Sequence, residues 1–360
     1  MQEINTRNLD DLLNYTCSLK ASDLHINVGS KPTIRLNSTL QTISGTEVVT
    51  PDISWELVKP LLDENKLKQL EINGDVDFSF SKAGLGRFRV NVYRQRGSYS
   101  IAIRSLPFII PPFDSLGLPQ VIKGFTKKTR GLILATGPTG SGKSTTLASI
   151  LNMINEERRA HIITIEDPIE YLHKHKNGLI DQREVGADAR SFASALRATL
   201  REDPDVILVG EMRDPETISI ALTAAETGHL VFSTLHTVGA AKTIDRIIDS
   251  FPPAQQNQVK SQLATVLEGV VSQQLIPKRD GSGIAVAVEV MLVNAAIRNL
   301  IREGKPYQIN STIQTSSNIG MQSMEANLAQ LCAEGVITQE DALIRASDSQ
   351  LFYQLLNKRW

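Results

Sequence analysis

One motif constrains the fold of this chain more than any other, an octapeptide that reads GPTGSGKS from Gly137 to Ser144. It matches the pattern G-x-x-x-x-G-K-[ST] of a phosphate-binding loop. The apolar run at residues 131–136 predicts a buried strand before the loop, and residues 144–155 predict a helix after it. A glycine-rich turn in that position directs backbone N–H groups and the positive end of the helix at one point, where a polyphosphate fits.

Each residue type in this loop has an expected role. We expect Lys143 to neutralise the β- and γ-phosphates and the Ser144 hydroxyl to bind Mg²⁺. The glycines allow close approach and positive φ angles. A chance match in a glycine-rich turn is the alternative, and the flanking strand and helix argue against it. The residues expected to bind nucleotide are Gly137, Pro138, Thr139, Gly140, Ser141, Gly142, Lys143, Ser144 and Thr145.

Length and composition limit the class of protein. A chain of 360 residues has the length of about two domains, and its 41% hydrophobic content is ordinary for a soluble globular protein. The formal net charge of -1 argues against general nucleic-acid binding. Cys17 and Cys332 form no CxxC pair, which argues against a zinc module and fits a reducing cytoplasm. We see no signal peptide and no run near the ~18 apolar residues of a membrane span, so we expect no direct membrane insertion.

The apolar pattern divides the chain into four predicted parts. Residues 1–105 alternate short helical stretches with strands and predict an α+β domain. Residues 106–119 are proline-rich and predict a linker, because proline removes hydrogen-bond donors and stiffens the chain. In residues 120–293, strands and helices alternate, which predicts a parallel sheet covered on both faces, with one long helical stretch at residues 255–274. Residues 294–360 are predicted to be entirely helical.

Carboxylates follow two of the predicted buried strands. The sequence DVILVGE ends on Glu211, at the position of a Walker B acid that polarises the attacking water directly or through Mg²⁺. The sequence ITIEDPIEY places Glu166 and Asp167 after another strand, next to the phosphate loop if the two strands lie close in the sheet. A solvated loop acid is the alternative for Glu211, and a turn at Asp167-Pro168 is the alternative for Asp167.

A histidine follows a further predicted strand, residues 230–234. The sequence STLHT places His236 at the same edge of the sheet, within reach of a γ-phosphate. A lone histidine is usually structural, but the hydroxyl side chains on either side of this one favour a sensor of the γ-phosphate.

Phosphoryl transfer also requires positive charge near the leaving oxygens, and arginines for this purpose commonly come from a neighbouring domain or subunit. The basic strands before the linker offer Arg94, Arg96 and Arg104. Two readings stay open: at least two of these arginines face nucleotide, or they protect a solvated edge strand by charge.

Taken together, these segments resemble the secretion ATPases of the additional-strand RecA-like class and, more narrowly, the PilT-type retraction ATPases of type IV pili. ASDLHI resembles the family's N-terminal signature, GPTGSGKST its Walker A, ITIEDPIEY its Asp box, residues 178–214 the stretch into its Walker B, and STLHT its His box. AIRNLIREGK at residues 296–305 and GMQSMEANL at residues 320–328 are similar to motifs of the retraction branch. The tetracysteine zinc site common in assembly ATPases is missing from the sequence.

The resemblance implies an α/β fold with a RecA-like P-loop NTPase core, an N-terminal α+β PAS-like domain and a C-terminal helical region. It implies a homohexameric ATPase motor that uses ATP and Mg²⁺ to power pilus retraction and twitching motility. The expected partners are an inner-membrane pilus platform protein and a paralogous pilus ATPase, and the expected location is cytoplasmic, peripheral at the inner face of the cytoplasmic membrane.

Carried over to this sequence, the resemblance assigns Lys143 and Ser144 to phosphate and Mg²⁺. Glu211 becomes the catalytic carboxylate, with a water-mediated contact to Mg²⁺, Glu166 belongs to the Asp box, and His236 senses the γ-phosphate. The N-terminal arginines would reach the nucleotide.

Three other functions stay open at this point. A pilus-assembly or type II secretion ATPase would use the same chemistry with the opposite direction of work. A nucleotide-gated binding module would bind ATP but turn over too slowly for a motor. A nucleic-acid motor of RecA type is disfavoured by the near-neutral charge and by the lack of an aromatic-basic stripe in the sequence.

Overall fold

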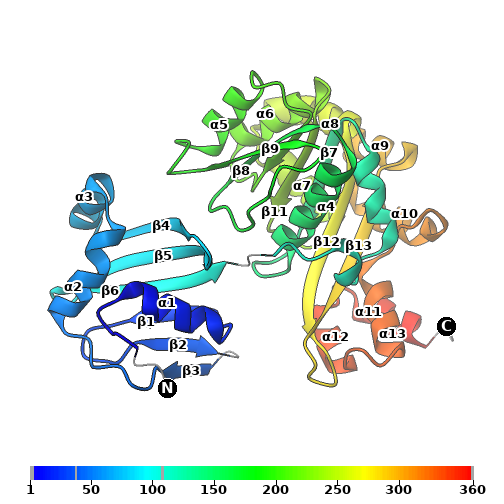
Figure 1. Ribbon diagram of the computed structural model, residues 1–360. Helices are drawn as coiled ribbons and strands as arrows, with labels where there is room; N and C mark the ends of the chain where they lie inside the picture. The colour runs from blue at the N-terminus through cyan, green and yellow to red at the C-terminus, as the bar shows by residue number, and fades with distance from the viewer. Residues whose placement is uncertain (1–3, 37–38, 107–108, 358–360) are drawn as a thin grey trace. The chain divides into compact units, whose positions relative to one another are not determined.

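The computed structural model describes residues 4–36, 39–106 and 109–357, and the chain divides into two compact units (Figure 1). The first unit comprises Met1–Ile109 and the short segment Pro168–Leu172. The second comprises Ile110–Asp167 and His173–Trp360. Residues 107 and 108 of the predicted linker lie outside the described residues.

The first unit has an antiparallel sheet with α-helices, which agrees with the expected α+β domain. Its strand order is β3-β2-β1-β6-β5-β4. Alternate residues of β5, among them Phe88, Val90 and Val92, are buried in the core of this unit, as the period of a half-buried strand requires. The elements are α1 (Leu9–Ser18), β1 (Asp23–Ile26), β2 (Thr33–Leu36), β3 (Thr39–Thr42), α2 (Pro51–Val58), α3 (Glu64–Asn73), β4 (Asp75–Lys82), β5 (Gly86–Gln95) and β6 (Ser98–Leu106).

The second unit contains a sheet with the strand order β13-β12-β7-β11-β10-β8-β9. The pairs between β12 and β9 in this order are parallel, and β13 is antiparallel to β12. Its strands are β7 (Gly131–Thr136), β8 (His161–Glu166), β9 (Leu179–Glu184), β10 (Val206–Val209), β11 (Leu230–Leu235), β12 (Leu267–Pro277) and β13 (Ile284–Leu292).

Both faces of this sheet are covered, as expected for a RecA-like core. Leu132 and Leu134 of β7 pack into one hydrophobic cluster with α6 (Pro215–Glu226) and α7 (Ala240–Asp249). Ile133 and Ala135 of the same strand point the other way, into a cluster with α4 (Lys143–Glu157). All six residues of β7 are buried, which explains its continuous apolar run.

One expectation for this unit was wrong. The helix predicted at residues 255–274 ends early: α8 spans Pro253–Val266, and the chain continues directly into β12. Gly269 on β12 leaves room for the ring of Phe125, because a Cβ there would lie 2.3 Å from its Cζ. The segment is a strand because it pairs with β7 on one side and with β13 on the other, and this pairing overrides the local helical spacing.

The second half of the predicted linker packs against this core. Phe113 and Leu118 are only 4% and 6% exposed and belong to the same cluster as α4. Beyond β13 the described elements are helical, with a single isolated β-bridge between Val290 and Gln322. These helices are α9 (Ala295–Arg302), α10 (Ile309–Thr315), α11 (Met324–Ala333), α12 (Gln339–Arg345) and α13 (Ser349–Leu356).

Candidate nucleotide site

The carboxyl ends of four parallel strands bring the sequence motifs to one edge of the sheet. Thr136, the last residue of β7, lies opposite Leu235 of β11. Val209 of β10 pairs with both Ser233 of β11 and Ile165 of β8. The residues that follow these strands share the edge where ligands bind in open α/β sheets. They are the phosphate loop, His236, Glu211 and Glu166.

The strand order corrects one placement. The strand that leads to His236, β11, is the direct neighbour of β7, whereas β10 and then β8 follow beyond it. With about 4.8 Å between neighbouring strands, the end of β8 lies about 14 Å from that of β7. The condition set for Glu166 and Asp167, that their strand lies close to the loop's strand, is therefore not met. Their catalytic role stays a prediction.

The phosphate loop is shaped for close approach of an anion. Gly137 has φ +138°, and a Cβ there would lie 2.3 Å from the carbonyl oxygen of Gln273. Lys143 is 8% exposed, and its Nζ donates to the carbonyl oxygens of Gly137 at 2.8 Å and Pro138 at 2.9 Å. The ammonium group is thus held over the loop, at the N-terminus of α4, where the helix dipole favours a negative ligand.

Gln273 supports this loop from β12 and was missed by sequence reasoning. Its Nε2 donates to Thr146 Oγ1 at 2.9 Å, a buried contact that joins β12 to the first turns of α4. Gln273 lies within the stretch that was expected to be helical. The β-branched pair Val270-Val271 just before it is the signal that favours a strand there.

Glu211 lies at the centre of a small charged cluster. It is 9% exposed, and its Oε2 lies 3.3 Å from His236 Nε2 while its Oε1 lies 2.5 Å from the guanidinium of Arg213. Arg213 itself is 71% exposed. Asp214 caps α6 by accepting from the Thr217 backbone N–H at 2.8 Å, so it organises the loop after β10.

Glu166 is held by neighbours in its own part of the sheet. Its Oε1 accepts from Thr164 Oγ1 at 2.6 Å and from Gln182 Nε2 at 3.1 Å. Gln182 belongs to β9, an edge strand that sequence reasoning did not predict because its apolar residues are few and partly exposed.

Arg94 and Arg104 have contacts inside the first unit, and Arg96 lies in a turn of the same unit. Arg104 Nε donates to Asp23 Oδ1 at 2.8 Å. Burial opposes ionisation of Asp23, but hydrogen bonds from Arg104 and Ser22 hold its pKa below the usual value. Arg94 lies over the ring of Tyr99, with 5.9 Å to the centroid, and Arg96 occupies the turn between β5 and β6 with φ +49°. That any of the three reaches nucleotide stays a prediction.

The helix α9, which carries the AIRNLIREGK motif, packs on the core of the second unit. Ile297 and Ile301 are fully buried. Arg298 donates from NH1 to the carbonyl oxygens of Ala264 and Thr265, both at 2.8 Å, and from NH2 to Glu268 at 2.6 Å. The guanidinium thus satisfies carbonyl groups that the end of α8 leaves without helical partners.

Among the residues that the structure describes, no group of three or more His, Cys, Asp or Glu side chains is arranged to hold a metal ion by itself. Across the same described ranges, none of the helices has the length and apolar character that crossing a membrane requires.

The site and the fold can now be compared with known proteins. Residues 115–343 match the family model of type II/IV secretion system proteins. This chain belongs to that family. It is 47% identical over 319 residues to a twitching motility protein of Neisseria gonorrhoeae, covering 89% of this chain and 85% of the relative. It is 45% identical over 344 residues to the type IV pilus retraction ATPase PilT of Pseudomonas aeruginosa, covering 96% and 99%.

A solved structure agrees with these relatives. The crystal structure of the pilus retraction motor PilT with bound ADP superimposes with a TM-score of 0.91 at 48% identity, covering 96% of this chain and 99% of that one. The resemblance to PilT-type retraction ATPases is therefore confirmed, as is the RecA-like α/β fold. The chain is an ATPase of the pilus-retraction type.

Proposed function

We propose that this chain hydrolyses ATP at the carboxyl edge of the sheet in its second unit and that hydrolysis powers retraction of a type IV pilus. One observation carries the proposal. A buried carboxylate, Glu211, contacts His236, and His236 follows the strand that pairs directly with the strand of the phosphate loop. This contact supports Glu211 as a general base and His236 as a sensor at the edge where a triphosphate would end.

The binding part of the site would be supplied by residues 137–145. The backbone of the loop and the N-terminus of α4 would hold the phosphates, and Lys143 would neutralise the β- and γ-phosphates. In this proposal Lys143 exchanges its contacts with the two loop carbonyl groups for phosphate oxygens. Gln273 would keep the helix in place during this exchange through its bond to Thr146.

The donor set at this edge fits Mg²⁺. Ser144 offers a hydroxyl oxygen next to Lys143, and Glu211 offers a carboxylate that acts through water. Mg²⁺ characteristically combines few protein oxygens with phosphate oxygens and water, so the lack of an acidic cluster within the described ranges does not conflict with it. When bound, the ion would neutralise charge that develops on the phosphates.

The catalytic part would be Glu211, His236 and Glu166. Glu211 would orient and deprotonate the attacking water, and His236 would respond to the presence of the γ-phosphate through its contact with Glu211. Glu166, two strands further from the loop than His236, would act through ordered water rather than by direct contact.

As a motor, the chain would act within a larger assembly of several copies. We infer a PAS-like domain at residues 1–105, a linker at 106–119, an ATPase domain at 120–293 and a helical subdomain at 294–360. A homohexamer would let Arg94, Arg96 and Arg104 reach nucleotide held by a second unit. The ring would act on an inner-membrane platform protein, together with a paralogous pilus ATPase, at the cytoplasmic face of the membrane. The support is the near full-length likeness to PilT.

The experiment combines turnover with a count of surface pili. Glu211→Gln should lower ATP turnover by at least about 100-fold while nucleotide still binds. Glu226→Gln, at the exposed end of α6, is the matched control and should hydrolyse ATP at the parental rate. Cells with the Glu211→Gln chain should carry excess pili that do not retract. Bald cells would instead favour pilus assembly, and unchanged turnover would remove Glu211 from catalysis.

A further inference from the structure

A line of paired residues crosses the sheet at the level where the site begins. Thr136, the last residue before the phosphate loop, pairs with Leu235 on one side and with Ser272 on the other. Ser272 in turn pairs with Glu289 of β13. Glu289 therefore lies at the same level of the sheet as the residues that immediately precede the phosphate loop and His236.

Glu289 is a buried carboxyl residue that has no role in the ATP binding and hydrolysis proposed above. It is 7% exposed, and its Oε1 accepts from the backbone N–H of Ala240 at 2.7 Å. The hydroxyl of its neighbour Ser272 accepts from the backbone N–H of Gly239 at 2.9 Å. Both N–H groups belong to the start of α7, three and four residues after His236. Glu289 and Ser272 thus hold the far end of the loop that carries the histidine.

The other side of Glu289 faces the C-terminal helices. Its two neighbours on β13, Val288 and Val290, both hydrogen-bond to the segment around the start of α11. Gln322 and Val290 exchange two backbone hydrogen bonds, at 2.9 and 3.1 Å, and Asn327 accepts from the backbone N–H of Val288 at 2.8 Å. These contacts tie the start of α11 to β13, on either side of Glu289 in the sequence.

The tie continues beyond α11. Glu325 is buried, and its Oε1 accepts from the backbone N–H groups of Ser347 and Asp348 at 3.1 and 3.2 Å, just before α13. Burial and the neighbouring Glu325 carboxylate raise the pKa of Glu289. Charge on Glu289 is therefore unfavourable, and its carboxyl group contributes to the fold by accepting a buried hydrogen bond from the backbone at the start of α7.

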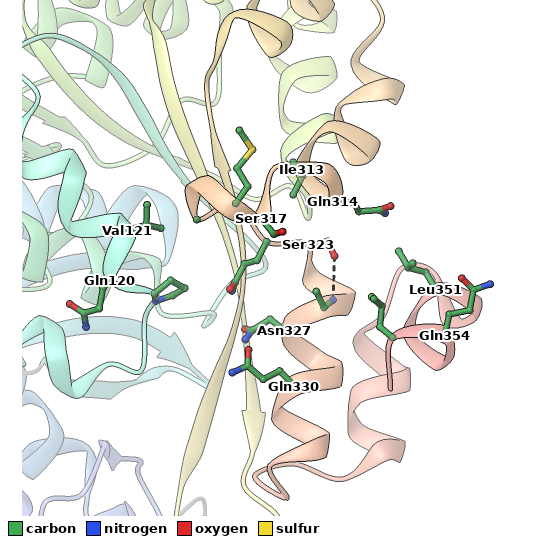
Figure 2. Close-up of a pocket in the computed structure, with 16 residues that line it drawn as sticks. Gln120, Val121, Ile313, Gln314, Ser317, Ser323, Asn327, Gln330, Leu351 and Gln354 are labelled. Carbon is green, nitrogen blue, oxygen red and sulfur yellow. Dashed lines mark hydrogen bonds between the residues drawn. The ribbon is translucent and has the colours of Figure 1, made fainter. Parts of the chain in front are cut away.

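The helix α11 has space to move on another side. It borders a cavity of about 690 Å³ that is also lined by α10, α13 and residues 119–121 (Figure 2). The side chains of Asn327 and Gln330 on α11 lie along this cavity, and uncharged side chains line the rest of it. A helix that is bonded to β13 at its start and borders open space on another side can shift when β13 shifts.

We propose that Glu289 is a positioning residue that couples the His236 loop to α11, so that occupation of the γ-phosphate site changes the position of the C-terminal helices. The proposal rests on the proposed function, in particular on His236 as the group that responds to the γ-phosphate. A displacement of the loop reaches Ala240 through the backbone and passes to Glu289 through one hydrogen bond. It then reaches α11 through the backbone of β13, whose residues on either side of Glu289 hydrogen-bond to Gln322 and Asn327. Retraction requires that nucleotide binding and hydrolysis change the positions of protein segments, and Glu289 connects the nucleotide site to such a segment over a short distance.

The test measures amide hydrogen exchange of the full chain with and without a non-hydrolysable ATP analogue and Mg²⁺. In the parent, the analogue should slow exchange in residues 320–330 by at least about threefold. In Glu289→Ala this difference should vanish while the dissociation constant of the analogue changes less than about threefold, because the phosphate loop is untouched. The turnover number should fall by about 10- to 100-fold with little change in KM, since the His236 loop loses its anchor.

Two variants keep the test decisive if Glu289→Ala folds poorly. Glu289→Gln retains the size and one acceptor oxygen and should give an intermediate loss. Ser272→Ala frees the Gly239 N–H and should weaken the coupling in the same direction. Glu268→Gln is the matched control. It changes a carboxylate at the start of β12, four residues before Ser272, and should keep the nucleotide-dependent difference at α11.

The outcomes separate this inference from the proposed function. If the parent hydrolyses ATP but α11 exchanges at the same rate with and without the analogue, the coupling is overturned and the ATPase assignment stands. The same holds if folded Glu289→Ala or Glu289→Gln keeps the full difference. If the parent neither binds nor hydrolyses ATP, the proposed function fails, and the coupling fails with it.

Discussion

Glu211 and His236 contact each other across neighbouring strand ends, with 3.3 Å between Oε2 and Nε2. The two residues differ in their surroundings: Glu211 is buried, whereas the side chain of His236 is 51% exposed. The buried partner is therefore fixed by the protein, and the exposed partner is free to respond to a ligand. This asymmetry suits a base that must stay in place and a sensor that must move.

Replacement of His236 should separate catalysis from stability. We expect His236→Ala to lower ATP turnover by about 10- to 100-fold, because Glu211 loses the group that orients it. The free energy of unfolding should change by less than about 0.5 kcal/mol, since the imidazole is half exposed. Steady-state kinetics and urea unfolding of the same preparation check both parts. Parental turnover in this variant would rule out the histidine as a catalytic partner.

Two glycines of the phosphate loop should respond differently to an added methyl group. Gly137→Ala would place its Cβ 2.3 Å from the Gln273 carbonyl oxygen, whereas Gly140→Ala has nothing within 4 Å. Both have positive φ, at +138° and +78°, so both should lose about 1 kcal/mol of stability from backbone strain. Overpacking should cost Gly137→Ala about 1–3 kcal/mol more. Urea unfolding of the pair measures the difference, and equal losses would contradict the clash with β12.

Arg298 should contribute to stability through its fork of donors. Lysine cannot reproduce the contacts to the carbonyl groups of Ala264 and Thr265 together with the one to Glu268. We expect Arg298→Lys to lower the free energy of unfolding by about 1–3 kcal/mol. Arg302→Lys, at an exposed position on the same helix, is the control and should change little. A null result for Arg298→Lys would mean that α9 is held by its apolar side alone.

His173 should make the fold sensitive to mild acid. Burial, with a smaller contribution from Lys176, lowers its pKa from 6.5 to about 4. Between pH 6.5 and about 4, His173 is protonated in the unfolded chain but stays neutral in the folded chain. The free energy of unfolding therefore has its full value above pH 6.5 and falls as the pH decreases to about 4. The full loss corresponds to about 3 kcal/mol.

The measurement for His173 is urea unfolding at pH 7 and pH 5. His173→Asn should lose less stability between the two pH values than the parent does. His236→Ala, which removes an exposed histidine, should follow the parent. If the parent and His173→Asn show the same pH dependence, the acid sensitivity arises from other groups.

Sequence reasoning succeeded where the signal is contiguous. Three features each lie within one short segment, so their residue types alone were enough to recognise them. They are the phosphate loop with its strand and helix, the acid after β10 and the histidine after β11. The strand predicted at residues 131–136 has the same bounds as β7 in the structure for the same reason, since its run is fully apolar.

Sequence reasoning failed where the structure or role of a residue depends on a partner far away in the chain. β12 has helical spacing and becomes a strand because β7 and β13 pair with it. The exposed strand β3 has no apolar alternation to detect. Gln273, Ser272 and Glu289 carry no motif, and their importance follows from the backbone groups they meet across the sheet.

The sequence by itself determined the phosphate-loop motif and the candidates Glu211 and His236, because phosphate binding, general-base catalysis and γ-phosphate sensing each need particular side chains in particular short patterns. The tertiary structure alone decided the order of the strands. That order makes His236 a neighbour of the phosphate loop, sets Glu166 further away and places Glu289 on a strand that contacts both α7 and α11. The physical reason is that strand pairing is non-local: the hydrogen bonds that fix the neighbours of a strand are made with residues far away in the chain.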